Sequence, residues 1–352
     1  MITKNAEADK LLENIKEIEN SKDDSRRMFK AIQVINKKSN TNIVVCNSEG
    51  EIAGNTSKKI EYITDHFKKQ FYKDSEKPFP EIKPQKLDNP FTINEIENAI
   101  KSLKNNKSSG CDKLRAEHLK YAPSEIKEEI VLLLNTIAET GEYPKEIKLG
   151  QLTPLQKPGK PKGPPENLRP VILLSTLRKI LAICLIKRTS NRLHEKTIPV
   201  TQTAYTSNRS TTELVFTFKV LAEKAITSIG YETNLLLLDM SKAFDTIKRD
   251  LLIEDLKEVL NNDEIHLVAL LLENVELCVK LENLLGSAFK TNIGSPQGDG
   301  ASALFFITYL AKSLKKTPKK DDNKIHSAIQ RLLALNQNQI KNIQKLQNTY
   351  KK

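Results

Sequence analysis

The stretch that decides the fold is Leu235-Leu236-Leu237-Leu238-Asp239-Met240-Ser241-Lys242-Ala243-Phe244-Asp245. Four successive leucines predict a strand, Asn234–Asp239, that is buried on both faces. A carboxylate at the rim of such a strand is costly unless a cation meets it, and a divalent metal is the usual partner where the site is made of oxygens. Asp239 is therefore a candidate metal ligand. Its alternative role is to cap the helix that begins near Ser241.

A second motif follows further along the chain, in Gly294-Ser295-Pro296-Gln297-Gly298-Asp299-Gly300. Gly298 allows a backbone or a ligand to approach closely, and Gln297 carries both donors and acceptors. Alone, the Pro-Gln-Gly triplet is only a turn signal. The apolar residues that follow it predict a helix over 302–314, and this combination is more specific than the triplet.

A basic segment precedes both motifs. We expect a short strand over 151–155, a loop rich in Lys, Pro and Gly over 157–165, and a segment from Arg169 to Leu174 that leads into a helix through Leu193. Lysine, as at Lys157, supplies a mobile point charge, and arginine, as at Arg169, supplies a bidentate donor for phosphate. Lys160 and Lys162 are interpreted as solvated loop lysines.

Taken in order, these blocks resemble a reverse transcriptase of the non-LTR (LINE-type) retrotransposon kind. Lys107–Asp112 resembles the first fingers block, Gln202–Thr212 the block before motif A, Leu235–Asp245 motif A and Gly294–Gly300 motif B. The resemblance spans roughly Phe91 to Leu314. A chance match of all the blocks in order is very rare.

The resemblance implies an α/β fold (α+β) with fingers and a partial palm, richer in helix than in strand and without a thumb. It implies that Asp239 is the catalytic metal ligand for Mg²⁺, that Phe244 is the steric gate beneath the incoming sugar, and that Asp245 has a helix-start or structural role. The implied partners are an RNA template, a DNA primer and dNTPs. The implied nucleotide and template contacts are Lys157, Arg169, Gln297 and Gly298.

The family's third block, an aromatic residue followed by x-Asp-Asp, has no good counterpart in the sequence. The only aspartate pair after motif B is Asp321-Asp322, inside a lysine-rich run without flanking apolar residues. Since one carboxylate cannot hold two magnesium ions, we expect a chain truncated before that motif and inactive as it stands, so that enzyme activity is uncertain. The alternative is a non-catalytic nucleic-acid-binding remnant. A purely structural helical protein is disfavoured by the ordered blocks.

The sequence predicts five regions along the chain. They are a helical and hairpin segment (1–77), a proline-rich linker (78–90), the fingers (91–230), the partial palm with motifs A and B (231–314) and a basic Asn/Gln/Lys-rich tail (315–352).

Local signals predict several elements within these regions. We expect a hairpin over 43–52, helices over 60–71 and 214–229, a capping box at Thr92 and a helix over 124–140 that stops at Gly141. Two strands, 277–281 and 288–293, are expected to be joined by a turn near Gly286.

Composition limits the partners. The net charge is +12, and the segment Lys145–Lys196 alone carries twelve Lys or Arg against three Glu, which favours a polyanionic partner. The four cysteines are far apart and form no CxxC pair, so we expect no disulfide partner and an intracellular, reducing compartment, with nucleus and cytoplasm left open. The longest apolar region, Val171–Ile186, is interrupted by Arg178 and Lys179, so no membrane partner is expected.

Overall fold

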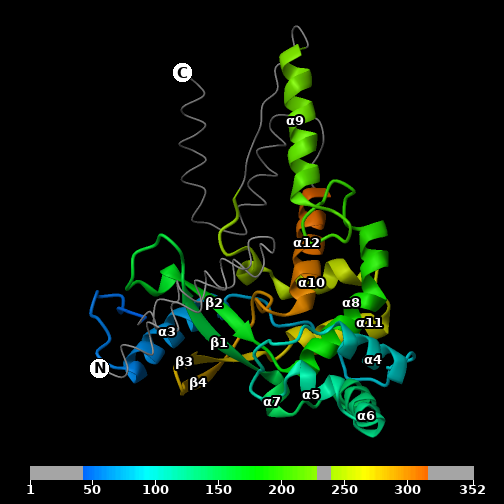
Figure 1. Cartoon of the computed structure of the whole chain (residues 1–352), viewed down its shortest axis with the longest axis horizontal. Coiled ribbons are helices and arrows are strands. Elements are labelled where there is room, and N and C mark those ends of the chain that lie inside the picture. Colours follow the sequence, from blue (N-terminus) through cyan, green and yellow to red (C-terminus); the bar gives the residue numbers. More distant parts are fainter. Residues whose placement is uncertain (1–42, 228–238, 316–352) are drawn as a thin grey trace, which may run out of the picture. The chain divides into compact units, whose positions relative to one another are not determined.

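The computed structural model describes residues 43–227 and 239–315. The predicted strand Asn234–Asp239, apart from Asp239 itself, and the tail beyond residue 315 lie outside the described residues. All the features below belong to the unit that begins at Val45. This unit combines helices with one small sheet, which confirms a mixed α/β class (Figure 1).

The sheet joins two hairpins that are far apart in the sequence. Strand β1 (Leu149–Gln156) pairs antiparallel with β2 (Leu168–Leu173), and β3 (Glu276–Leu281) pairs antiparallel with β4 (Leu284–Lys290). Strands β1 and β3 run parallel, so the strand order is β2-β1-β3-β4. β2 is therefore an edge strand of this sheet, and the N–H of Ile172 on its outer side donates to the carbonyl of Gln297.

The turn between β3 and β4 corrects the sequence prediction. It lies at Glu282 and Asn283, where Glu282 has φ +56°, and not near Gly286. Gly286 lies within β4, and a Cβ atom there would be 2.5 Å from Cγ2 of Ile60. Glycine at this position thus serves the close packing of a helix on the strand instead of a turn.

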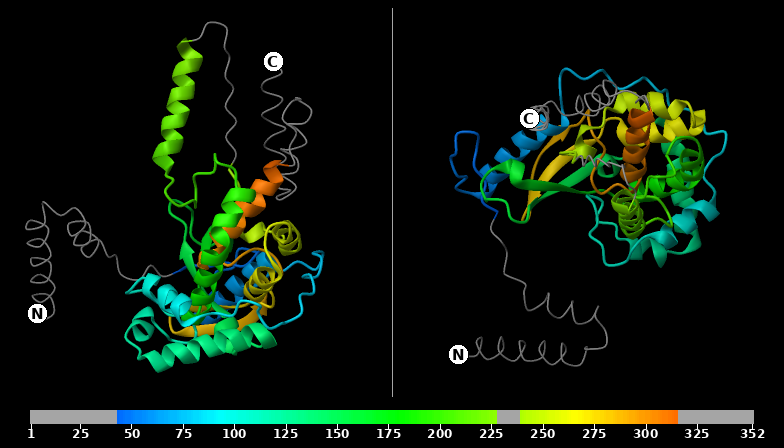
Figure 2. Two further views of the ribbon diagram at one scale, coloured as in Figure 1. Left: turned by 90° about the vertical axis from the view of Figure 1, so that its right-hand side faces the viewer. Right: turned by 90° about the horizontal axis from the view of Figure 1, so that it is seen from above.

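That helix is α3 (Thr56–Phe71), which lies against β3 and β4 on one face of the sheet (Figure 2). Its buried side chains include Ile63 and Phe67, and the sheet contributes buried residues such as Leu152 and Val279. The N-cap is Asn55, whose side chain accepts a hydrogen bond from the backbone N–H of Lys58 at 2.8 Å.

The opposite face of the sheet is only partly covered. Residues that are directly paired across strands point to the same face, and here Leu155 pairs with Arg169 while Thr153 pairs with Val171. Leu155 and Arg169 are exposed, and Thr153 and Val171 are half-buried.

The remaining helices form the larger part of the unit. Two predicted helix signals are confirmed: Thr92 forms a capping box with Glu95, and Gly141 ends α6 in the left-handed conformation at φ +70°. The helices are α4 (Ile93–Ser102), α5 (Ala116–Lys120), α6 (Ser124–Thr140), α7 (Lys145–Lys148), α8 (Thr176–Lys196), α9 (Thr211–Thr227), α10 (Arg249–Lys257), α11 (Asn262–Leu272) and α12 (Gly300–Lys315).

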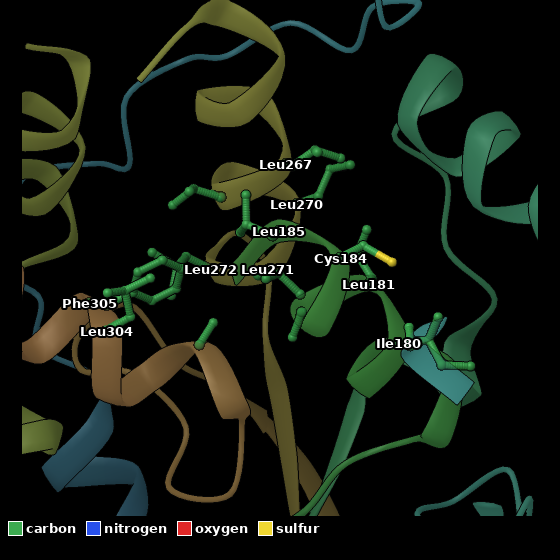
Figure 3. Close-up of a cluster of buried hydrophobic side chains, with 14 of the residues drawn as sticks. Ile180, Leu181, Cys184, Leu185, Leu267, Leu270, Leu271, Leu272, Leu304 and Phe305 are labelled. Atoms are coloured by element: carbon green, nitrogen blue, oxygen red, sulfur yellow. The ribbon is translucent and has the colours of Figure 1, made fainter. Parts of the chain in front are cut away.

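The main core lies where α8, α11 and α12 meet (Figure 3). Leu181 and Leu185 of α8, Leu267 and Leu271 of α11 and Phe305 of α12 are all buried there. Each such side chain contributes about 1.5–3 kcal/mol by leaving water, so this cluster fixes the start of α12 and the loop before it.

None of the described helices is long and apolar enough to cross a lipid bilayer. The four cysteines, Cys46, Cys111, Cys184 and Cys278, are free thiols.

Candidate functional site

The backbone of the turn after Asp239 is joined to the backbone of the glycine-containing loop. The N–H of Gly294 donates to the carbonyl of Ile247 at 2.8 Å, and the N–H of Ser295 donates to the carbonyl of Phe244 at 2.9 Å. Gly294 has φ +78°, and a Cβ atom there would be 2.8 Å from the carbonyl oxygen of Asp245. The two motifs are therefore parts of one local structure.

The side chain of Arg249 binds the segment of the chain that leads into this loop. Its side chain is buried, and the guanidinium donates to the carbonyls of Leu272 (2.7 Å), Thr291 (2.9 Å), Gly294 (2.8 Å) and Ile293 (3.2 Å), and to the hydroxyl of Thr291 (2.9 Å). Burial lowers its pKa to about 9. The guanidinium is thus satisfied by backbone oxygens, and it fixes the path of residues 291–294.

Asp245 lies at the centre of the site. Its carboxylate is buried and accepts a hydrogen bond from Nε2 of Gln297 at 2.9 Å and another from Nε2 of Gln70, in α3, at 2.9 Å. Lys242 donates from Nζ to Oε1 of Gln70 at 2.5 Å. Burial raises the pKa of Asp245 to about 6, while Gln297 and Lys242 act in the opposite direction. Both oxygens of Asp245 are therefore engaged by amides.

His66 lies one turn before Gln70 on α3. Burial, with a further contribution from the ammonium of Lys242, lowers its pKa to about 4. Within the described part of the chain, its buried Nε2 atom has no hydrogen-bond partner. His66 is thus held neutral at pH 7 beside two cationic groups, Lys242 and Lys157.

The loop that carries Gln297 and Gly298 lies against the edge of the sheet. The N–H of Ile172, in β2, donates to the carbonyl of Gln297 at 3.0 Å. Gly298 has φ +126°, and a Cβ atom there would be only 2.3 Å from the carbonyl oxygen of Ile172. Glycine is required at this position by both the backbone conformation and the contact with β2.

Buried polar contacts hold the same loop from the core side. Nε of Arg178 donates to Oδ2 of Asp299 at 3.3 Å, and Oδ1 of Asp299 accepts from the N–H of Ala301 at 3.1 Å. The hydroxyls of Ser295 and Ser302 lie 2.7 Å apart. These contacts tie the loop before α12 to α8 and to the first turn of α12.

The predicted steric gate, Phe244, is half-buried between two aromatic rings. Its ring centre lies 4.9 Å from that of Phe306 in α12 and 5.9 Å from that of Tyr205, which meets it edge-on. Aromatic pairs of this kind restrain the ring beyond their burial alone.

The two basic residues predicted to bind phosphate, Lys157 and Arg169, lie on different surfaces of the unit. Lys157 is half-buried at the end of β1, and its Nζ donates to the carbonyl of Glu166 at 2.6 Å. Arg169 is exposed on β2 and projects from the sheet face that α3 does not cover. Asp239 is exposed at the start of the turn. The structure therefore brings Gln297 and Gly298 to the motif A turn, with Lys157 near it, and leaves Arg169 on another surface.

The sequence did not single out Gln70, His66 or Arg249. The hydrogen bond from Gln70 to Asp245 crosses 175 residues, and no local pattern in α3 marks it. The position of Arg249 gave a weak indication of its role. A cation at the first turn of a helix is unfavourable with respect to the helix dipole, which suggests that it has partners elsewhere in the fold.

The described residues do not fit a site for two metal ions. No group of three or more His, Cys, Asp or Glu side chains that could hold a metal is found within 43–227 and 239–315. Both oxygens of Asp245 are engaged by glutamine amides, which leaves Asp239 as the exposed carboxylate of the turn. One carboxylate can hold a Mg²⁺ ion that keeps several of its waters, but it does not make a site for two metal ions.

Comparison with known proteins agrees with the family resemblance found in the sequence. The family model described as reverse transcriptase (RNA-dependent DNA polymerase) matches residues 155–333. Two similar proteins are from Drosophila melanogaster: a probable RNA-directed DNA polymerase from transposon BS, 30% identical over 63% of this chain, and one from transposon X-element, 26% identical over 62%. A third is the RNA-directed DNA polymerase from mobile element jockey of Drosophila funebris, 25% identical over 63% of this chain. The matched part is 24% of each relative, so the chain spans about a quarter of their length.

Proposed function

Because this chain belongs to the reverse transcriptase (RNA-dependent DNA polymerase) family, and to its LINE-type branch, we propose that it binds an RNA template, a DNA primer and a dNTP as an RNA-directed DNA polymerase domain does. The observation that carries the proposal is the hydrogen bond of 2.9 Å between Asp245 and Gln297, which couples the motif A turn to the motif B loop. In this proposal, residues 91–230 are the fingers and residues 231–314 are a partial palm that carries motifs A and B.

The incoming nucleotide lies over the motif A turn in this proposal. Phe244 acts as the steric gate, because a ring restrained by Phe306 and Tyr205 cannot yield to a 2′-hydroxyl. Gln297 contacts the nucleotide or the template. Its amide nitrogen is turned to Asp245, so its Oε1 atom is presented as an acceptor. Gly298 lets the template or the nucleotide approach the loop closely.

Lys157 and Arg169 contact phosphates in the proposal. Lys157 fits the triphosphate, because its ammonium lies near Lys242 and the motif A turn and is held there by a carbonyl oxygen. Arg169 is on the open face of the sheet, which suits a phosphate of the template strand better than the nucleotide bound over Phe244.

Asp239 is the proposed magnesium ligand. Since the described residues offer one exposed carboxylate in this turn, we propose that these residues by themselves bind the substrates without extending a primer. The alternative function is that of a nucleic-acid-binding remnant that does not bind dNTPs.

Three measurements test the proposal. Affinity of the full chain for a primer–template should fall steeply as KCl rises, and a flat response would contradict nucleic-acid binding. A fluorescent dNTP should bind more weakly to Lys157→Ala than to Lys160→Ala, a variant of the exposed lysine in the same loop. Primer extension on RNA with Mg²⁺ should give no product. A product that disappears in Asp239→Ala would show that the chain is an active polymerase.

A further inference from the structure

A cavity of about 300 Å³ lies between the linker, the segment that follows α6, and α11. This volume is at the lower end of the range for small-molecule pockets in proteins. One wall is a single face of α11, formed by residues three and four positions apart: His266, Ala269, Leu270 and Glu273. None of the residues proposed to bind the nucleotide or the template lines this cavity, so it is a separate site.

The linker, which contributes residues 81–84 to another wall, is fixed against the helices by two contacts. A Cβ atom at Gly141, which ends α6, would be 2.6 Å from Cγ of Pro84, so glycine lets the linker pack closely there. The carboxylate of Asp263, in the first turn of α11, accepts hydrogen bonds from the N–H groups of Asp88 (3.2 Å) and Asn89 (2.9 Å). The cavity is therefore enclosed by elements that the fold holds in place.

His266 brings an unused hydrogen-bond acceptor to the cavity. Its side chain is buried, and its Nε2 atom lies 2.6 Å from the carbonyl oxygen of Ala138. Because a carbonyl can only accept, Nε2 carries the proton, and Nδ1 of the neutral ring is an acceptor. Nδ1 has no hydrogen-bond partner among the residues that the structure describes. A buried acceptor that the protein itself does not satisfy indicates a donor from a ligand.

Tyr143 brings an unused donor. Its hydroxyl oxygen is buried and has no partner within the described part of the chain. Burial raises the pKa of this phenol above its ordinary value, so the hydroxyl keeps its proton and can donate it in a hydrogen bond. One face of the ring is occupied by Lys148, whose Nζ lies 5.4 Å from the ring centre. The residues that line the cavity thus offer one acceptor and one donor that the protein does not use.

The charged side chains around the cavity balance one another in number. Two carboxylates, Glu81 and Glu273, stand against two ammonium groups, Lys83 and Lys148. None of the four forms an ion pair within residues 43–227 and 239–315. Equal numbers of the two signs favour neither an anion nor a cation, which disfavours a polyanion such as a dNTP and favours a ligand without net charge.

We propose that this cavity binds a small neutral amide, whose N–H donates to Nδ1 of His266 and whose carbonyl oxygen accepts from the hydroxyl of Tyr143. An amide joins in one group the donor and the acceptor that the two side chains require. The apolar body of the ligand packs against Ala269 and Leu270, which are buried in the wall formed by α11. The inference goes beyond the proposed function and does not depend on it.

NMR of the full chain, labelled with ¹⁵N only in its histidines, tests the inference. The chain has five histidines, so the ring resonances are few, and His266→Gln assigns those of His266. The probes are benzamide and 2-pyridone, and the matched control is methyl benzoate, which keeps a ring and a carbonyl but has no N–H. Either amide should move the Nδ1 resonance of His266 upfield, the direction for an acceptor that gains a hydrogen bond. Methyl benzoate at the same concentration should leave it unchanged.

His194 serves as an internal control. Its Nδ1 lies 2.8 Å from the carbonyl oxygen of Ser190, and its buried Nε2 also has no partner among the described residues, but it does not line the cavity. Its resonances should stay in place when an amide is added. Equal shifts at His194 and His266 would overturn the inference, and so would the absence of a shift with both amides.

A second measurement uses a variant that keeps the fold. Tyr143→Phe removes only a hydroxyl that no described residue binds, so the chain should fold as the wild type does, while its affinity for benzamide should fall about tenfold. The control is Tyr121→Phe, at an exposed tyrosine outside the cavity, which should keep the wild-type affinity. Unchanged affinity in Tyr143→Phe would overturn the inference. Displacement of benzamide by a dNTP would do the same, because the amide would then occupy the proposed nucleotide site.

Discussion

Oδ1 of Asp245 accepts a hydrogen bond of 2.9 Å from the side-chain amide of Gln297, and Oδ2 accepts one of 2.9 Å from Gln70. Replacing Asp245 by alanine leaves two half-buried amides, those of Gln70 and Gln297, without this acceptor. We expect a loss of about 1–3 kcal/mol in the free energy of unfolding, together with weaker dNTP binding, because Gln297 is no longer oriented. Urea denaturation and a fluorescent dNTP measure the two effects. Asp65→Ala, at an exposed position of α3, should change neither, and an equal effect there would contradict the role of Asp245.

The stability of the chain should depend on pH between about 4 and 6.5 through two groups of opposite sign. Asp245 has its pKa raised to about 6 in the folded chain, so the folded state binds the proton more readily and stability falls as pH rises through this range. His66 has its pKa lowered to about 4, so the unfolded state binds more protons and stability rises with pH over the same range.

Single variants separate these two contributions. Asp245→Asn should leave a free energy of unfolding that increases with pH between 4 and 6.5, and His66→Gln one that decreases. Urea denaturation at several pH values, with each variant compared with the wild type, gives the slopes. Parallel curves for both variants and the wild type would contradict the assignment.

Arg249 should be among the most sensitive positions for stability. Lysine in its place keeps the charge but cannot reach the carbonyls of Leu272, Thr291, Ile293 and Gly294 together. We expect Arg249→Lys to destabilise the chain by about 3–5 kcal/mol, the range for breaking a buried charged network. Thermal or urea denaturation measures it. Arg209→Lys, on a partly exposed side chain paired with Glu213, should cost under about 1 kcal/mol.

The local elements were predictable and the contacts that build the site were not. The capping box at Thr92 and the stop at Gly141 follow from signals within a few residues, and both are confirmed. The turn at Glu282 was missed because a glutamate with φ +56° is not a turn signal in sequence.

The roles that the sequence did not reveal depend on packing between residues that are far apart in the chain. The sequence alone suggests that Gly286 is a turn residue, and its contact with Ile60 becomes apparent only in the folded structure. The same holds for Gln70, whose role depends on α3 being docked on the sheet. The pairing of the two motifs was implied by the family resemblance, but the hydrogen bond between Asp245 and Gln297 required the fold.

Gly298 offers a test of the contact between the motif B loop and β2. Alanine there places Cβ 2.3 Å from the carbonyl oxygen of Ile172, in addition to the strain of φ +126°. Gly159 also has a positive φ, +71°, but a Cβ atom there meets nothing within 4 Å. Gly159→Ala should therefore cost about 1–2 kcal/mol from backbone strain alone, and Gly298→Ala clearly more. Equal losses in urea denaturation would show that the contact with Ile172 does not constrain the loop.

Phe244 provides the sharpest test of how the nucleotide is selected. If its ring lies beneath the sugar, Phe244→Val opens space for a 2′-hydroxyl, and the ratio of ribonucleotide to deoxynucleotide affinity should rise by about tenfold or more, which corresponds to about 1.4 kcal/mol. Competition of rNTP and dNTP against a fluorescent dNTP measures the ratio without requiring polymerisation. The matched control is Phe79→Val, the same change at a half-buried phenylalanine that packs against the helical core. A merely structural role for Phe244 predicts that both variants lower the two affinities together. An unchanged ratio in Phe244→Val would refute the gate.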